Sequence, residues 1–128
     1  MLNSIQNIIQ LSKKRINFLH HVDSRNYYKG YQTYIDAIQD ELSEATQEIK
    51  QHNTVYLEDE LGDVFWCYIC LLHSLEEDGY IRTERVFQRC LKKFSERLQA
   101  DYDRQAWVEI KHQQKQKLKK EHEEKHGK

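Results

Sequence analysis

Apolar residues recur at intervals of three and four along most of the chain, which is the spacing of one face of an α-helix. The clearest stretch runs from Tyr31 to about Lys50 and holds this spacing for about five turns. Similar patterns run from Ser4 to Val22 and from Leu57 to about Glu77, and another begins at Thr83, a residue suited to a helix cap. The pattern therefore predicts four amphipathic helices.

Residues that interrupt helices are scarce. The chain has no proline and only four glycines among its 128 residues, which favours helix throughout. Connections are predicted at residues 23–30, 51–54 and 101–104, and Gly79 suits the left-handed conformation that ends a helix. These features predict an all-α fold class, arranged as a bundle of four to five helices.

The chain is long enough for one core, since it has 128 residues of which 38% are hydrophobic. We expect a single helical domain over residues 1–111. The remaining residues 112–128 contain one aliphatic side chain, Leu118, and cannot bury an apolar face of their own. They are expected to form a polar, charged helical extension or a disordered tail.

The predicted third helix is apolar on two sides. Trp66, Ile69 and Cys70 project away from the main stripe of this helix at about 100° per residue. A single layer of amphipathic helices would leave them in water. We therefore expect either a central position for this helix or a second subunit that covers it.

Composition excludes several classes of protein. No stretch approaches the roughly 18 to 20 apolar residues that cross a bilayer, and no apolar run at the N-terminus precedes a cleavage site. The three cysteines are an odd number, and Cys67 and Cys70 are interpreted as small buried side chains. We expect a cytoplasmic protein that binds neither a membrane nor, with a pI near 6.7, a nucleic acid polymer.

Charge is divided along the chain. Residues 36–63 carry nine acids and one base, whereas residues 82–120 carry twelve Lys and Arg and five acids. Such a division indicates two clusters that bind different parts of one ligand, or each other.

The acidic region contains two pairs of carboxylates at a spacing of three residues, Glu41 with Glu44 and Glu60 with Asp63. This spacing places each pair on one side of a helix, beside its apolar stripe. Antiparallel packing of the two helices would bring the pairs together. Because four carboxylates repel one another, we predict a divalent cation, Mg²⁺ with Mn²⁺ as a substitute. Gly62 would let the third helix approach its neighbour there.

Two other interpretations of these acids are possible. In a chain that is 32% charged, acidic pairs also arise on solvated faces, but these acids lack the interleaved Lys or Arg that solvated helices carry. A di-iron centre needs Glu-x-x-His on two buried helices, and this spacing occurs only from Glu123 to His126, in the polar tail.

The two pairs stand in DELSE and, fifteen residues later, ELGDVFW. This text resembles the EExxE and ExxD signature of the MazG-like nucleotide pyrophosphohydrolases, in the all-α NTP pyrophosphohydrolase superfamily. KKFSERL occupies the place of the basic K-x-x-x-R stretch of that family, and AWVEIKHQQK is similar to its W-x-x-I-K segment. The resemblance runs from about Tyr31 to Gln114. Asp40 stands where the family has the first Glu of EExxE.

The resemblance implies an oligomeric, magnesium-dependent enzyme that hydrolyses a nucleoside triphosphate to the monophosphate and pyrophosphate. By motif position it implies metal ligands at Glu41, Glu44, Glu60 and Asp63, with phosphate contacts from Lys93 and Arg97 and a nucleotide segment at Trp107 and Lys111. A carboxylate not fully engaged by metal would accept a proton from the attacking water, and Glu41 and Glu44 are the candidates.

We therefore expect a pyrophosphohydrolase acting on NTP or dNTP as a homodimer or dimer of dimers, with removal of non-canonical nucleotides as its role. The alternatives are a non-catalytic helical oligomer, such as a scaffold or regulatory partner, and the same fold acting on dUTP or phosphoribosyl-ATP.

Overall fold

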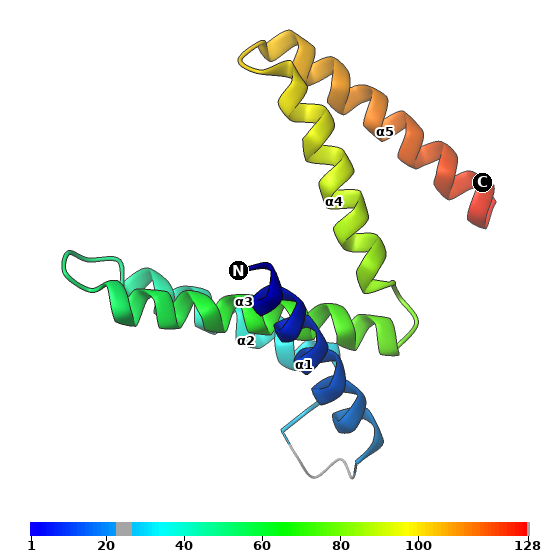
Figure 1. The fold of residues 1–128 in the computed structure, drawn as a ribbon. Coiled ribbons are helices and arrows are strands. Elements are labelled where there is room, and N and C mark those ends of the chain that lie inside the picture. The colour runs from blue at the N-terminus through cyan, green and yellow to red at the C-terminus, as the bar shows by residue number, and fades with distance from the viewer. Residues whose placement is uncertain (23–26, 128) are drawn as a thin grey trace. The chain divides into compact units, whose positions relative to one another are not determined.

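The computed structural model describes residues 1–22 and 27–127 of the chain, and part of the predicted connection at 23–30 lies outside these ranges. Figure 1 shows that the described residues form helices joined by short connections. The helices are α1 (Leu2–His21), α2 (Tyr31–Gln47), α3 (Thr54–Glu77), α4 (Thr83–Arg97), the short 3₁₀ helix η1 (Leu98–Ala100) and α5 (Arg104–His126). The predicted all-α fold class is confirmed.

The helix ends lie close to those that the sequence predicts. α2 begins at Tyr31 after Gly30, whose φ of 74° is in the left-handed region. α3 ends at Glu77, and Gly79 has a φ of 81°, as expected of a glycine that ends a helix. The amide groups of Gly79 and Tyr80 donate to the carbonyls of Glu76 and Leu75, so the last turn of α3 is satisfied.

Contacts within the chain fall into two compact units, the N-terminal unit Met1–Thr83 and the C-terminal unit Glu84–Lys128. The N-terminal unit contains α1, α2 and α3, with α3 packed against both of the others. Its core consists of buried side chains from α1, from α2 with the residues before it, and from α3: Ile16, Leu19, Tyr28, Tyr34, Cys67 and Cys70.

α3 takes the central position that its two apolar sides predict. Ile69 and Cys70 are fully buried, whereas Trp66 is partly buried against the core. Leu61 and Tyr68, which belong to the main apolar stripe of α3 and not to the side that carries Trp66, Ile69 and Cys70, remain 49% and 42% exposed. The second apolar side is therefore covered inside the unit, and part of the first one is open.

The connection between α2 and α3 is a tight turn closed by a side chain. Asn53 donates from Nδ2 to the backbone oxygen of Glu48 at 2.7 Å and to its Oε2 at 2.6 Å. His52, inside the turn, has a φ of 57°. A turn this short makes the two helices antiparallel neighbours, which aligns their acidic pairs.

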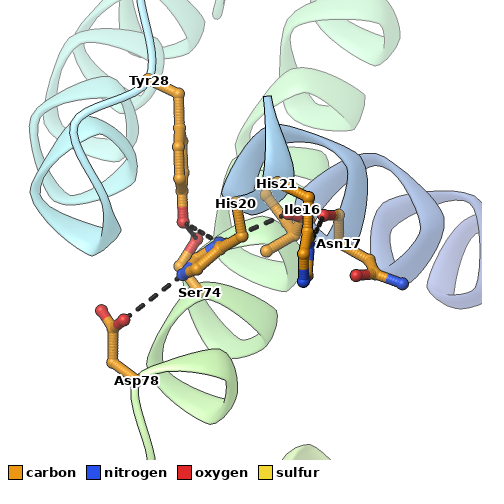
Figure 2. A network of polar contacts seen from close by, with 7 residues as sticks. All are labelled: Ile16, Asn17, His20, His21, Tyr28, Ser74 and Asp78. Carbon is orange, nitrogen blue, oxygen red and sulfur yellow. Dashed lines mark hydrogen bonds and ion pairs between the residues drawn. The ribbon is translucent and has the colours of Figure 1, made fainter. Parts of the chain in front are cut away.

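A polar network joins the end of α1 to the end of α3 (Figure 2). The Tyr28 hydroxyl donates to Ser74 Oγ at 3.1 Å and lies 3.0 Å from His20 Nδ1. The other ring nitrogen of His20, Nε2, lies 3.3 Å from Asp78 Oδ1. These bonds satisfy polar groups at the edge of the core and help to orient α1.

A second polar contact lies deeper between the same two helices. Ser12 is fully buried, and its Oγ lies 2.9 Å from Nδ1 of His73 and donates to Cys70 Sγ at 3.3 Å. Burial lowers the pKa of His73, so the neutral imidazole is the favoured form. Cys67 and Cys70 are free and buried, as predicted.

In the C-terminal unit, α4 and α5 run antiparallel as a helical hairpin. Asp103 caps α5, because its Oδ1 accepts from the amide groups of Gln105 and Ala106 at 3.0 and 3.2 Å. Near the open end, Arg89 makes two hydrogen bonds to Glu121, at 3.0 and 2.8 Å.

The predicted break at residues 101–104 is present, between η1 and α5. α5 then continues to His126, so residues 112–126 are helical. The single domain over residues 1–111 stays a prediction. In the part of the chain that the structure describes, no helix is both long and apolar enough to span a bilayer.

Candidate metal centre

Three of the four predicted metal ligands come together between α2 and α3. Glu41 of α2 and Glu60 and Asp63 of α3 each offer a carboxylate oxygen, and these three atoms lie within 4.8 Å of one another. Glu60 and Asp63 share one side of α3 because they are three residues apart. The antiparallel turn places Glu41 opposite them. We refer to Glu41, Glu60 and Asp63 as the acidic centre.

Two oxygens of the acidic centre are buried without a partner. Glu41 Oε2 and Glu60 Oε2 are shielded from solvent and have no hydrogen-bond partner among the described residues. A buried carboxylate oxygen without a donor is costly, because desolvation penalises its charge and nothing compensates for it. This arrangement suits an added positive ligand.

Two acids of the centre, Glu41 and Glu60, have raised pKa values. Desolvation, followed by the charge of Glu44, raises the pKa of Glu41 to about 7. Desolvation also raises the pKa of Glu60, with contributions from the charges of Glu44 and Asp63. The repulsion that the sequence predicts is therefore present in the fold, and a cation would relieve it.

Glu44, the fourth predicted ligand, lies beside the acidic centre. It is exposed, and its charge acts on both Glu41 and Glu60. Glu48, the C-cap residue of α2, is held by Asn53 in the turn. Its charge also contributes to the raised pKa of Glu60, although it is not one of the three clustered ligands.

The donor set fits a hard divalent cation. All its atoms are carboxylate oxygens, which Mg²⁺ and Mn²⁺ accept, and described cysteine and histidine side chains are absent from the cluster. Exposure of Asp63 leaves one side open to water and substrate. Glu41, Glu60 and Asp63 are the residues that could hold the ion.

The prediction that Gly62 lets α3 approach a neighbouring helix is wrong within this unit. A Cβ atom added at Gly62 would meet no described atom within 4 Å. Gly62 is exposed, and no described helix of the unit comes close to it.

The predicted phosphate-binding residues Lys93 and Arg97 belong to the C-terminal unit. Arg97 donates from Nε to Gln114 Oε1 at 2.9 Å, and its guanidinium carbon lies 5.5 Å from the ring centre of Phe94 and 5.8 Å from that of Trp107. Lys93 lines a groove of about 220 Å³ between α4 and α5.

Trp107 and Lys111 lie one turn apart on α5, and both are partly buried. Trp107 stacks on Arg97 within this unit, so its ring holds a basic side chain in place. The structure thus brings Arg97 and Trp107 together.

A family model of the MazG nucleotide pyrophosphohydrolase domain matches residues 29–100, more than half of the chain. The chain belongs to this family. The resemblance noted in the sequence is confirmed, and the MazG domain is that of nucleotide pyrophosphohydrolases. Comparison with curated proteins gave no match, and neither did comparison with solved structures.

The MazG match covers both acidic pairs together with Lys93 and Arg97, and it ends before Trp107 and Lys111. The acidic centre therefore lies wholly inside the family domain.

Gln114, beyond the MazG match, is a residue that sequence reasoning missed. It is 8% exposed; its Nε2 donates to the backbone oxygen of Lys93 at 3.0 Å and to Glu96 Oε1 at 3.1 Å, while its Oε1 accepts from Arg97. The signal was present in the spacing of Trp107, Gln114 and Glu121, seven residues apart on one face of α5.

Proposed function

We propose that this chain is a magnesium-dependent nucleotide pyrophosphohydrolase that converts a nucleoside triphosphate, NTP or dNTP, to the monophosphate and pyrophosphate. The observation that carries the proposal is the pair of buried, unpartnered oxygens of Glu41 and Glu60 inside the acidic centre of a MazG domain. Solvated acidic pairs would not bury carboxylate oxygens without donors.

Glu41, Glu60 and Asp63 are proposed to hold Mg²⁺, with Mn²⁺ as a substitute. When bound, the ion supplies positive charge for phosphate oxygens and lowers the pKa of water. The three carboxylates come from two rigid helices, so the site is pre-organised before the substrate arrives.

Glu44 is the better of the two candidates for the general base. It is exposed at the edge of the acidic centre and is not one of the three clustered ligands. Its carboxylate would accept the proton of a water molecule as that water forms a bond to phosphorus and the phosphoanhydride P–O bond breaks, the electron pair leaving with the departing phosphate oxygen. Glu41 would serve as the general base only if it did not bind the metal ion.

Lys93 and Arg97 are proposed to contact phosphate oxygens, Arg97 with the guanidinium N–H groups that Gln114 leaves free. Trp107 would hold Arg97 in place, and Lys111 would add charge beside it. We further propose one functional domain over residues 1–111, assembled as a homodimer or dimer of dimers in the cytoplasm, with removal of non-canonical nucleotides as its role.

Pyrophosphate release from a panel of canonical and modified nucleoside triphosphates tests this function. The native chain is measured with magnesium and with chelator, beside Glu60→Gln and the matched control Glu58→Gln, which changes an exposed acid two residues earlier on α3. We expect magnesium-dependent release that Glu60→Gln abolishes and Glu58→Gln retains. Absence of release from every triphosphate by the folded protein would contradict the proposal and favour the non-catalytic oligomer.

A further inference from the structure

The N-terminal unit contains a cavity of about 410 Å³ where its three helices meet. α1 contributes an apolar and two cationic side chains, and aromatic side chains come from α3, from α2 and from just before α2. The lining residues are Leu11, Lys14, Arg15, Tyr27, Tyr34 and Trp66. None of the residues assigned above to the metal, the general base or the phosphates lines this cavity.

Register along the helices places this cavity next to the acidic centre. Tyr34 precedes Glu41 by seven residues on α2, two turns and about 10 Å along the axis on the same side of the helix. Trp66 follows Asp63 by one turn on α3. A ligand whose phosphates lie at the acidic centre could therefore extend its other end into the cavity.

The contacts between α2 and α3 support this placement. The charges of Glu41 and Asp63 act on Cys67, and Tyr34 contacts the thiol of Cys70 one turn further along α3. The path from the acidic centre to the cavity thus follows one helix interface inside one unit.

The aromatic lining suits a flat ring. Trp66 is partly buried, so its ring is held in place by the core and part of it stays accessible, whereas Tyr34, at 5% exposed, is too covered to stack on a ligand. Fixed aromatic faces stack on planar ligands without losing much side-chain freedom. Leu11 adds an apolar contact from α1.

The polar groups of the lining are mainly hydrogen-bond donors. Lys14, Arg15 and the indole N–H of Trp66 only donate, and the hydroxyl oxygens of Tyr27 and Tyr34 lie 3.5 Å apart, so one hydroxyl donates to the other. No carboxylate or amide oxygen is among the six lining side chains. A ligand ring that displays acceptors would find several donors here, whereas an amino group would find side-chain acceptors only in the two tyrosine hydroxyl oxygens, one of which already accepts from the other.

We propose that this cavity binds the base of the nucleotide and prefers rings with carbonyl oxygens, of the uracil and thymine type, over the amino-bearing rings of cytosine and adenine. The inference rests on the proposed function, since it places the phosphates of the same nucleotide at the acidic centre. Uracil and thymine present carbonyl acceptors where cytosine and adenine carry amino donors. Cytosine or adenine would leave hydrogen-bond donors unpaired in the cavity, which lowers the affinity for these two bases.

Binding of the product monophosphates in the presence of Mg²⁺ tests the cavity separately from hydrolysis, because a monophosphate has no phosphoanhydride bond to break. Calorimetric titration of the whole chain compares dUMP with dCMP, which share sugar and phosphate, and uses ribose 5-phosphate as a probe without a base. We expect dUMP to bind about tenfold more tightly than dCMP. Equal affinities for all three probes would overturn the proposal.

Two variants distinguish stacking on the Trp66 ring from hydrogen-bond donation by the Tyr34 hydroxyl. Tyr34→Phe should reduce the preference for dUMP because it removes one hydroxyl and keeps the ring, whereas Trp66→Leu should weaken both monophosphates. The control Tyr31→Phe changes an α2 tyrosine that packs edge-on against Tyr80 and lies outside the cavity lining, and it should leave both affinities unchanged. Circular dichroism verifies that each variant is folded.

Two further outcomes separate the possible failures. Selective binding of dUMP without hydrolysis of any triphosphate would leave the cavity assignment intact and contradict the proposed function. Hydrolysis that neither discriminates between dUTP and dCTP nor responds to Trp66→Leu would contradict the cavity assignment alone. Sedimentation could instead reveal a dimer that is lost on Trp66→Leu and is not displaced by dUMP. Such a dimer would mean that a second copy fills the cavity, and it would overturn the proposal.

Discussion

The acidic centre and the α4–α5 hairpin use the same side chain in opposite ways. In the hairpin, hydrogen bonds from Arg89 lower the pKa of Glu121. In the acidic centre, burial and neighbouring carboxylates raise the pKa of Glu41 to about 7. Glu121 has a cationic partner that joins two helices, whereas Glu41 has an oxygen without any partner in the described residues. Paired charges mark a structural contact, and unpaired buried charges mark a site for a ligand.

Removal of one acid from each region gives the largest expected contrast. Asp63→Asn should lower kcat/KM for triphosphate hydrolysis about 100-fold or more, because a metal ligand accounts for several kcal/mol of charge stabilisation. Glu121→Gln should change it little, because that acid pairs with Arg89 in the hairpin. Steady-state kinetics on both variants measures the contrast, and similar losses would remove the distinction between the two regions.

The hairpin should depend on Gln114 for its stability. Gln114→Ala removes the hydrogen bonds to the Lys93 backbone, to Glu96 and to Arg97, and we expect a loss of about 1–3 kcal/mol in the free energy of unfolding. Denaturant titration of the whole chain measures it. Gln113→Ala, at the exposed neighbouring position, is the matched control. Equal stabilities of the two variants would show that these bonds contribute nothing.

Substitution in the acidic centre should raise stability, whereas substitution of Gln114 lowers it. Glu41→Gln removes a charge that is buried beside other carboxylates, so without divalent cations it should raise Tm by a few degrees. Added Mg²⁺ should raise Tm of the native chain and not that of the variant. Thermal melts with chelator and with Mg²⁺ measure both effects. A lower Tm of the variant in chelator would contradict the assigned repulsion.

The smallest expected effect is a pH dependence from the α1–α3 contact. Burial lowers the pKa of His73 below its ordinary 6.5; Lys13 lowers it further, while Glu76 and Glu77 raise it. The unfolded chain therefore takes up a proton at pH values where folded His73 does not. The stability due to neutral His73 is present above about pH 6.5 and decreases as the pH falls through that value and below.

Denaturant titrations at pH 7.5 and pH 5.5 measure this dependence, with His73→Asn as the test and His112→Asn, at an exposed position, as the control. Protonation of Glu41 in the folded chain adds stability over the same pH interval, so the readout is the difference between the proteins. The native chain and the control should change alike, and His73→Asn should gain stability relative to both at the lower pH. An identical pH response of all three proteins would exclude a role for the buried imidazole.

Local spacing was enough to predict the helices and the chemistry of the acids. The period of apolar residues located α2 and α3 nearly to their ends, and the spacing of Glu60 and Asp63 placed both on one side of α3. Helical geometry relates residues three or four apart whatever the rest of the protein does. The family resemblance, confirmed over residues 29–100, came from the same short motifs.

Contacts between distant segments could not be predicted from the spacing of residues. Gln114 was placed in a solvated extension because the segment around it lacks apolar residues, yet it is buried by hydrogen bonds to α4. The space around Gly62 and the stacking of Trp107 on Arg97 likewise depend on which helix lies opposite.

The sequence by itself determined the all-α class, the family and the residues that share a helix face, because these follow from interactions between near neighbours in the chain. Only the tertiary structure decided that Glu41 meets Glu60 and Asp63 within 4.8 Å, that two of their oxygens are buried without a partner among the described residues, and that three helices line an open, donor-rich aromatic cavity. The physical reason is that desolvation and pairing of charges depend on distances between segments, and packing sets those distances.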